Sequence, residues 1–87
     1  MTGDPTFDRV RALVGRLAGP ERTPASIGPE TPLSEGGFHL DSVELLEVML
    51  ACEGELGMTF DNDPTATVHA LQTLGTLTSA VRARLRR

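Results

Sequence analysis

The chain has 87 residues, of which 39% are hydrophobic and only 3% aromatic, and its net charge at pH 7 is −4. A chain of this length forms one domain, residues 1–87, with a small core, and the shortage of aromatic residues favours packed helices over a β-sandwich. One cysteine, Cys52, excludes an internal disulfide, and with two separated histidines it cannot supply the four ligands of a structural zinc site. We therefore expect an all-α domain without a resident metal.

The first predicted helix runs from Pro5 to Leu17. Asp4 can cap it, and Pro5 suits a first helical position. The pair Gly19-Pro20 then ends the pattern. Between these signals apolar residues recur with the period of a helix, at Phe7, Val10, Leu13, Val14 and Leu17.

The segment from Ala18 to Leu40 is expected to be a long connection without regular secondary structure. Pro and Gly residues interrupt it at several points, and neither a helical nor a strand period fits it. Such a connection is uncommon inside a compact domain unless it is functional or held by its own side chains. Four apolar residues are the candidates for holding it: Ile27, Leu33, Phe38 and Leu40.

The second predicted helix begins at Asp41-Ser42 and ends at Glu55 or Leu56, before Gly57. Its start has the Asp-x-x-Glu pattern of a capping box, and glycine is common just beyond a helix end. Five residues share the face that we expect to point into the core: Leu45, Val48, Met49, Cys52 and Leu56. The cysteine on this face is expected to act as a small hydrophobic side chain.

A second apolar stripe lies on roughly the opposite side of the same helix. It consists of Val43, Leu46 and Leu50, with Glu47 and Glu53 at its margins. One interpretation is that the helix is enclosed between other helices, so that both stripes belong to the core. The other is an exposed apolar patch bordered by carboxylates, which suits partners that offer Arg or Lys around a hydrophobic centre.

Two further helices are predicted. Asp63-Pro64 combines a cap with a first-position proline, and Val68 with Leu71 indicates a short third helix. Thr73 can cap a last helix, whose apolar stripe is formed by Leu74, Leu77, Val81 and Leu85. The predicted fold is thus an all-α bundle of four helices, with a long loop between helices one and two and a short third helix.

Charge is distributed unevenly along the chain. Between Thr23 and Val81 there are nine acidic residues and no Lys or Arg, whereas residues 1–22 and 82–87 hold four Arg each. The acidic middle should repel nucleic acid and attract basic proteins, and the last four Arg are expected to complement a helix dipole. No apolar run approaches membrane-spanning length, and the N-terminal residues lack the apolar segment of a secretory signal. We therefore expect a cytoplasmic protein that binds neither nucleic acid nor membrane.

Ser42 stands at the entrance of the second helix, immediately after the capping Asp41. A helix N-terminus has unsatisfied N–H groups and a positive dipole end, so a phosphate ester on this serine would gain about 0.3–1 kcal/mol. The carboxylates of Asp41 and Glu44 oppose that gain. Their presence makes sense if they help to hold a divalent cation while the ester is formed, because such cations prefer oxygen ligands.

These features together resemble the acyl carrier protein family. The run Leu40-Asp41-Ser42-Val43-Glu44-Leu45-Leu46-Glu47 is similar to the Asp-Ser-Leu motif of that family, in which the serine receives 4′-phosphopantetheine. The resemblance covers most of the chain, since it also includes Thr31-Pro32-Leu33 in the loop, Glu53-x-Glu55-Leu56-Gly57 and Thr73-Leu74-Gly75.

The resemblance implies a four-helix carrier-protein bundle with no catalytic activity of its own. A phosphopantetheinyl transferase would attach the arm from coenzyme A to Ser42, with Asp41 flanking the site and magnesium needed only during modification. The arm would hold acyl groups as thioesters and present them to acyl-loading, condensing or tailoring enzymes with basic docking surfaces, in fatty acid, polyketide or related biosynthesis. The carrier is expected to be a monomer. By resemblance its docking surface consists of Val43, Glu44, Leu46, Glu47, Leu50 and Glu53.

Three other interpretations remain open. A peptidyl or aryl carrier has a similar plan but more often has Gly or His before the serine, so Asp41 favours an acyl carrier. An unmodified acidic adaptor would bind its partner through the apolar stripe, and Ser42 would only cap the helix. A small hydrolase would use Ser42 with His39 or His69, but the sequence has no Gly-x-Ser-x-Gly elbow and no evident acidic group to orient the second histidine.

Overall fold

The computed structural model describes residues 5–60 and 63–85 of the chain. Asp4, the predicted cap of the first helix, lies outside these ranges, as do Asp61, one of the nine acidic residues of the middle segment, and Arg86 and Arg87, two of the last four Arg. The described residues form helices and irregular connections and contain no β-strand, so the prediction of an all-α protein is confirmed. None of the helices within the described ranges combines the length and the apolar character that crossing a bilayer requires.

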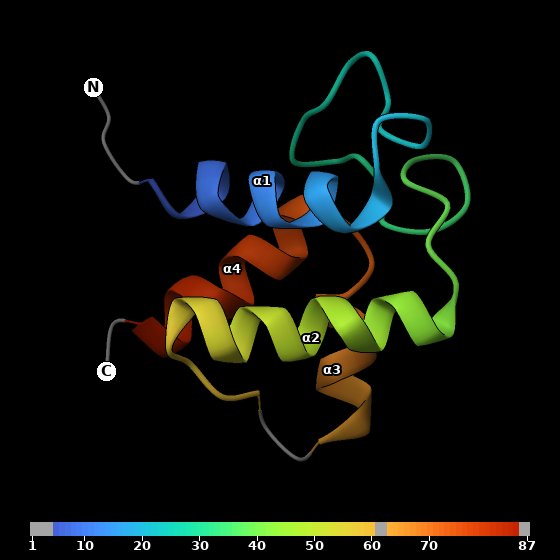
Figure 1. Cartoon of the computed structure of the whole chain (residues 1–87). Coiled ribbons are helices and arrows are strands. Elements are labelled where there is room, and N and C mark those ends of the chain that lie inside the picture. The colour runs from blue at the N-terminus through green and yellow to red at the C-terminus, as the bar shows by residue number, and fades with distance from the viewer. Residues whose placement is uncertain (1–4, 61–62, 86–87) are drawn as a thin grey trace.

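The helices follow in the order α1 (Thr6–Ala18), α2 (Ser42–Leu56), α3 (Pro64–Ala70) and α4 (Leu74–Leu85). The first is shifted by one residue from its predicted bounds, and the others begin where their capping signals predicted. In Figure 1, α1 and α2 run across the molecule, with α4 behind them and the short α3 below α2. Of the helix pairs, α1 packs against both α2 and α4, and α3 packs against α4.

Side chains at the predicted positions cap three of the helices. At the start of α2, Asp41 Oδ1 accepts a hydrogen bond from the Glu44 N–H (2.8 Å), and Glu44 Oε1 accepts one from the Asp41 N–H (3.0 Å). This is the predicted capping box. The Asp63 carboxylate and the Thr73 hydroxyl likewise accept hydrogen bonds from N–H groups in the first turns of α3 and α4. Gly57 ends α2 in the left-handed conformation, with φ of 70°.

A single hydrophobic core joins the helices and the α1–α2 connection. On α2 the predicted inner face is confirmed, because Val48, Cys52 and Leu56 are buried while Leu45 and Met49 are half-buried. The core consists of Val10, Leu13, Val14, Ala18, Leu33, Phe38, Leu40, Val48, Cys52, Leu56, Met58, Phe60, Ala70, Leu74, Leu77 and Val81.

Two apolar residues of the predicted helix patterns do not reach this core. Val68 is 65% exposed, and the buried residue of α3 is Ala70 instead. A two-turn helix lying at the surface buries only one narrow side, and Val68 lies off that side. Leu85 is 38% exposed, because the apolar stripe of α4 continues into the last turn of the helix, where fewer neighbours surround it.

Both buried side chains and backbone hydrogen bonds fix the connection between α1 and α2 against the rest of the domain. Leu33, Phe38 and Leu40 are buried and Ile27 is half-buried, as predicted. Backbone hydrogen bonds attach residues 29–33 to residues 72–75, the junction of α3 and α4: N–H groups of one segment donate to carbonyls of the other at 2.7–3.0 Å. The irregular segment that leads to Ser42 therefore has a defined position against the helices.

Candidate functional site

Ser42 is the first residue of α2, and its side chain is exposed. The segment before it is fixed, since the buried Leu40 donates its N–H to the Leu33 carbonyl at 3.0 Å. His39, which directly precedes Leu40, has a left-handed backbone with φ of 57° and is exposed. The local structure thus presents one hydroxyl to solvent at the positive end of a capped helix.

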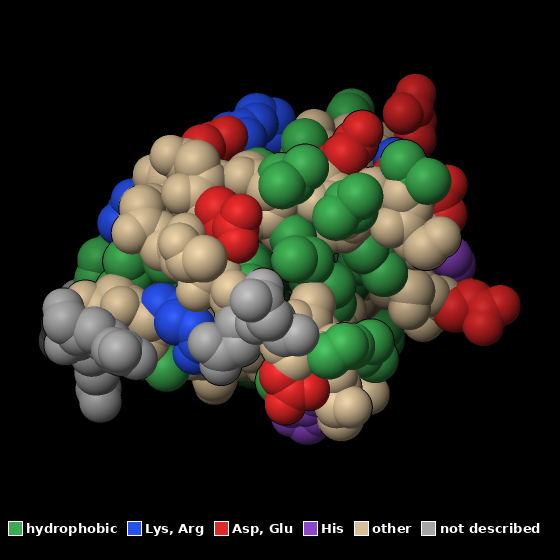
Figure 2. Space-filling view, turned by 90° about the horizontal axis from the view of Figure 1, so that it is seen from below, with side chains coloured by type: hydrophobic (Ala, Val, Ile, Leu, Met, Phe, Trp, Pro, Cys, Tyr) green, Lys and Arg blue, Asp and Glu red, His purple; other side chains and the backbone are tan. Residues whose placement is uncertain are grey.

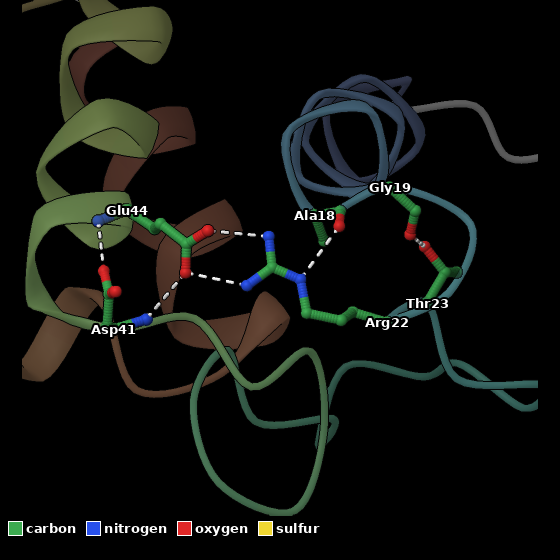
Figure 3. Close-up of polar contacts among 6 residues, drawn as sticks. All are labelled: Ala18, Gly19, Arg22, Thr23, Asp41 and Glu44. Atoms are coloured by element: carbon green, nitrogen blue, oxygen red, sulfur yellow. Dashed lines mark hydrogen bonds and ion pairs between the residues drawn. The ribbon is translucent and has the colours of Figure 1, made fainter.

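Arg22 connects this helix start to the end of α1. Its Nη1 and Nη2 atoms donate to Oε1 and Oε2 of Glu44 at 2.8 and 2.6 Å. Its Nε donates to the carbonyl of Ala18, the last residue of α1, at 3.0 Å. Figure 3 shows the extended arginine spanning the space between the two helices. The paired carboxylate is the same group that closes the capping box beside Ser42.

The turn that carries Arg22 has its own local cause. Gly19 ends α1 with φ of 86°, a conformation that glycine adopts without strain. Its carbonyl then accepts hydrogen bonds from the Arg22 N–H (3.3 Å) and from the Thr23 hydroxyl (2.8 Å). These bonds fold the chain back so that the arginine side chain points toward α2 (Figure 3).

The ion pair changes the electrostatics beside the serine. Hydrogen bonding by Arg22, followed by the Asp41 N–H, lowers the pKa of Glu44 from 4.5 to about 2. The same hydrogen bonding raises the pKa of Arg22. Glu44 is therefore ionised at any physiological pH, but its charge is balanced by the guanidinium that it contacts. Of the two carboxylates flanking Ser42, one belongs to a neutral pair.

The lowered pKa of Glu44 predicts an acid-sensitive contribution to stability. A depressed folded pKa stabilises the fold above the ordinary pKa of 4.5, and this stabilisation is lost as the pH falls through about 2. In Arg22→Gln the main cause of the shift is absent, so the free energy of unfolding should fall less between about pH 5 and pH 2 than in the wild type. Urea unfolding at both pH values measures this difference.

Arg16→Gln is the control for that measurement. It removes an equal charge from α1, where Arg16 forms an exposed ion pair with Glu55 at the other end of α2. Equal acid losses in the wild type and in Arg22→Gln would contradict the assigned role of the Arg22–Glu44 pair.

The second apolar stripe of α2 faces solvent. Val43, Leu46 and Leu50, here called the apolar patch, are 65%, 51% and 57% exposed. The interpretation that α2 is enclosed on both sides is therefore wrong: its opposite face, with Val48, Cys52 and Leu56, joins the core, and α1 packs against the helix. Figure 2 shows hydrophobic side chains gathered over α2 and α3 with acidic side chains at the margins. Val68 of α3, which the sequence did not single out as a surface residue, adds to the exposed hydrophobic area.

The acidic residues of α2 differ in how they are engaged. Glu53 is half-buried and accepts a hydrogen bond from the Phe60 N–H at 3.0 Å, so it ties down the segment that follows the helix. Glu55 pairs with Arg16. Glu47 is exposed and forms neither an ion pair nor a hydrogen bond through its side chain within residues 5–60 and 63–85. Fewer carboxylates of α2 are therefore left for a binding partner than the composition of the helix indicates.

The two histidines that the hydrolase interpretation would pair with Ser42 do not contact it through hydrogen bonds in the described parts of the chain. Both of them, His39 and His69, are exposed. No group of three or more potential metal ligands is found among these residues. Cys52 is fully buried, and desolvation raises the pKa of its thiol to about 11, which agrees with the predicted structural role.

A separate hollow of about 460 Å³ lies between α3 and α4, and Phe60, His69 and Ser79 are among its lining residues. No residue of α2 contributes to it. It is therefore distinct from the surface around Ser42 and the apolar patch.

Comparison with family models, with curated proteins and with solved structures finds no match to this chain. Functional inference consequently rests on the residues themselves and on their arrangement.

Proposed function

We propose that this protein is an acyl carrier protein that is modified with 4′-phosphopantetheine on Ser42. The observation that carries the proposal is the exposed hydroxyl of Ser42 at the capped start of α2, next to the apolar patch on the same helix. A carrier needs both features, because the same surface must receive the modifying enzyme and later present the cargo. The four helices and the long α1–α2 connection fit the carrier-protein bundle that the sequence resembles.

The residues around Ser42 suit a phosphodiester. The hydroxyl is exposed, so a transferase can reach it, and the first turn of α2 supplies a positive dipole end. The repulsion expected from Glu44 is offset by Arg22, which leaves Asp41 as the flanking carboxylate nearest to a magnesium ion during attachment. The bound arm supplies a thiol that holds an acyl group as a thioester.

The apolar patch is the proposed docking surface for the transferase and for acyl-loading, condensing or tailoring enzymes. Its exposed side chains can enter a hydrophobic site on a partner, and the acidic margin complements basic residues around that site. Docking of this kind should be weak and salt-sensitive, since a carrier visits several enzymes in turn. The protein would act as a monomer in the cytoplasm, in fatty acid, polyketide or related biosynthesis.

The proposal is tested by intact-mass spectrometry after incubation with coenzyme A, magnesium and a broad-specificity phosphopantetheinyl transferase. The wild type should gain the mass of one phosphopantetheine group, and Ser42→Ala should gain none. Ser79→Ala is the matched control, because Ser79 is also an exposed serine but lies within α4, away from a helix start. It should be modified as fully as the wild type.

The same experiment separates the acidic adaptor from the carrier. An adaptor needs the exposed apolar patch but has no use for a modified serine. Folded wild-type protein that gains no mass under conditions that modify a known carrier would sink the carrier proposal. The apolar patch would then be left as a protein-binding surface, with Ser42 serving only as a helix-start residue. A modified protein that accepts amino acids or aryl acids would instead point to a peptidyl or aryl carrier.

A further inference from the structure

The glutamate side chains of α2 differ in whether they form an ion pair or hydrogen bond within the described chain. Glu44 is held by Arg22, Glu53 accepts the Phe60 N–H, and Glu55 is paired with Arg16. Glu47 is exposed and has no such partner among the described residues. It follows Leu46 directly and lies one turn from both Val43 and Leu50, so its carboxylate borders the apolar patch.

We propose that Arg22 determines which carboxylate a docking partner recognises: it withdraws Glu44 into a neutral pair and leaves Glu47 as the acid beside the apolar patch. The inference rests on the proposed function of Ser42 and deepens it. The partner that fits this surface presents an apolar side chain with an Arg or Lys next to it. A second basic group aimed at Glu44 would meet a carboxylate that Arg22 already neutralises, so it would gain little attraction there.

The geometry of the pair explains why a partner does not simply displace Arg22. Its guanidinium makes three hydrogen bonds, two to Glu44 and one to the Ala18 carbonyl. Bidentate, charge-assisted pairs are stronger than single contacts, and only 34% of the Arg22 side chain and 26% of the Glu44 side chain remain exposed. An incoming arginine would have to break both Arg22–Glu44 bonds to gain one carboxylate, while the Ala18 carbonyl continues to hold Arg22 in place.

Competition at Glu44 also disturbs the helix start. Glu44 Oε1 accepts both the Arg22 Nη1 and the Asp41 N–H. A partner that pulled this carboxylate outward would open the capping box immediately next to Ser42. Recognition through Glu47 avoids this cost, because that side chain supports no hydrogen bond within the described chain.

The experiment measures the KM for phosphopantetheine loading by a broad-specificity transferase at about 0.1 M and about 0.5 M salt, where screening differs strongly. Glu47→Gln should raise KM about threefold at the lower salt, as expected for an exposed ion pair. Arg22→Gln uncovers Glu44 and should lower KM by a similar factor. Both differences should shrink at the higher salt. Far-UV circular dichroism and urea unfolding establish that each variant is folded.

Two further variants make the test specific. Arg22→Gln combined with Glu44→Gln removes the whole pair without a net change in charge, and the glutamine oxygen still accepts the Asp41 N–H. Its KM should stay within about twofold of the wild type. Arg16→Gln removes an equal charge and uncovers Glu55, eight residues beyond Glu47 and so roughly 12 Å along the helix. It should leave KM unchanged at about 0.1 M salt, where the Debye length is about 10 Å.

The outcomes separate this inference from the proposed function. If the wild type is loaded but Arg22→Gln leaves KM unchanged or raises it, Arg22 does not mask Glu44 and the inference fails alone. A double variant that is as impaired as Glu47→Gln would likewise show that partners read Glu44. If the wild type is not loaded at all, the proposed function fails, and this inference fails with it.

Discussion

Replacing Phe38 with alanine is expected to lower the free energy of unfolding by about 3–5 kcal/mol. Phe38 has no exposed surface and is the largest fully buried side chain of the described chain. It comes from the α1–α2 connection rather than from a helix, so its removal leaves a cavity where the connection is held against the core. For a domain of this length the total stability is about 4–13 kcal/mol, so the loss is a large fraction of it.

Urea unfolding of Phe38→Ala and of Leu50→Ala measures this effect against a matched control. Leu50 is also a large hydrophobic residue, but 57% of it is exposed, so its truncation should change stability by less than about 0.5–1 kcal/mol. A loss below about 1 kcal/mol for Phe38→Ala would mean that the connection is not packed as described. In that case the position of Ser42 would need another explanation.

Replacing Gly37 with alanine is expected to cost about 3 kcal/mol, at the upper end of the range for overpacked sites. A Cβ at this position would lie 1.9 Å from the Pro32 carbonyl oxygen and 2.8 Å from its carbon. These are backbone atoms, so no side-chain rotation relieves the clash. The Pro32 carbonyl also accepts the Phe38 N–H at 3.1 Å, and displacing it would disturb the segment that leads to α2.

Gly54→Ala is the control for this substitution, and it should have the opposite sign. Gly54 lies inside α2, and a Cβ there would meet no heavy atom within 4 Å. Alanine at an exposed helical position should therefore stabilise the protein by about 0.5–1 kcal/mol. Chemical denaturation of both variants tests the pair. A stable Gly37→Ala would show that the loop has room that the structure does not provide.

Local signals in the sequence were sufficient for the helices. Asp41, Asp63 and Thr73 cap their helices as predicted, and Gly57 ends α2. These positions could be read in advance because a cap acts through hydrogen bonds to residues two or three positions away. The inner face of α2 was equally readable, since helical periodicity places Val48, Cys52 and Leu56 on one side whatever packs against them.

The candidate site was only partly accessible in this way. The position of Ser42 at a helix start follows from local sequence. Its relation to Arg22 does not, because the two ends of the Arg22–Glu44 pair are separated by the whole α1–α2 connection. From the sequence, Arg22 was grouped only with the N-terminal arginines, and Glu44 was predicted to belong to the docking surface. A signal existed, as Arg22 is the last basic residue before the acidic stretch, but spacing alone does not reveal which acid it meets.

For this protein, then, the sequence by itself determined the four helices and the side-chain caps of α2, α3 and α4, because these depend on interactions within a few positions. Only the tertiary structure decided that Val43, Leu46 and Leu50 face solvent, that Val68 is exposed, and that Glu44 and Glu53 are engaged within the chain. The sequence of a helix with two apolar stripes does not show whether other segments of the chain cover one stripe or both. That coverage, and the charges left free for a partner, are set by contacts between segments far apart in the sequence.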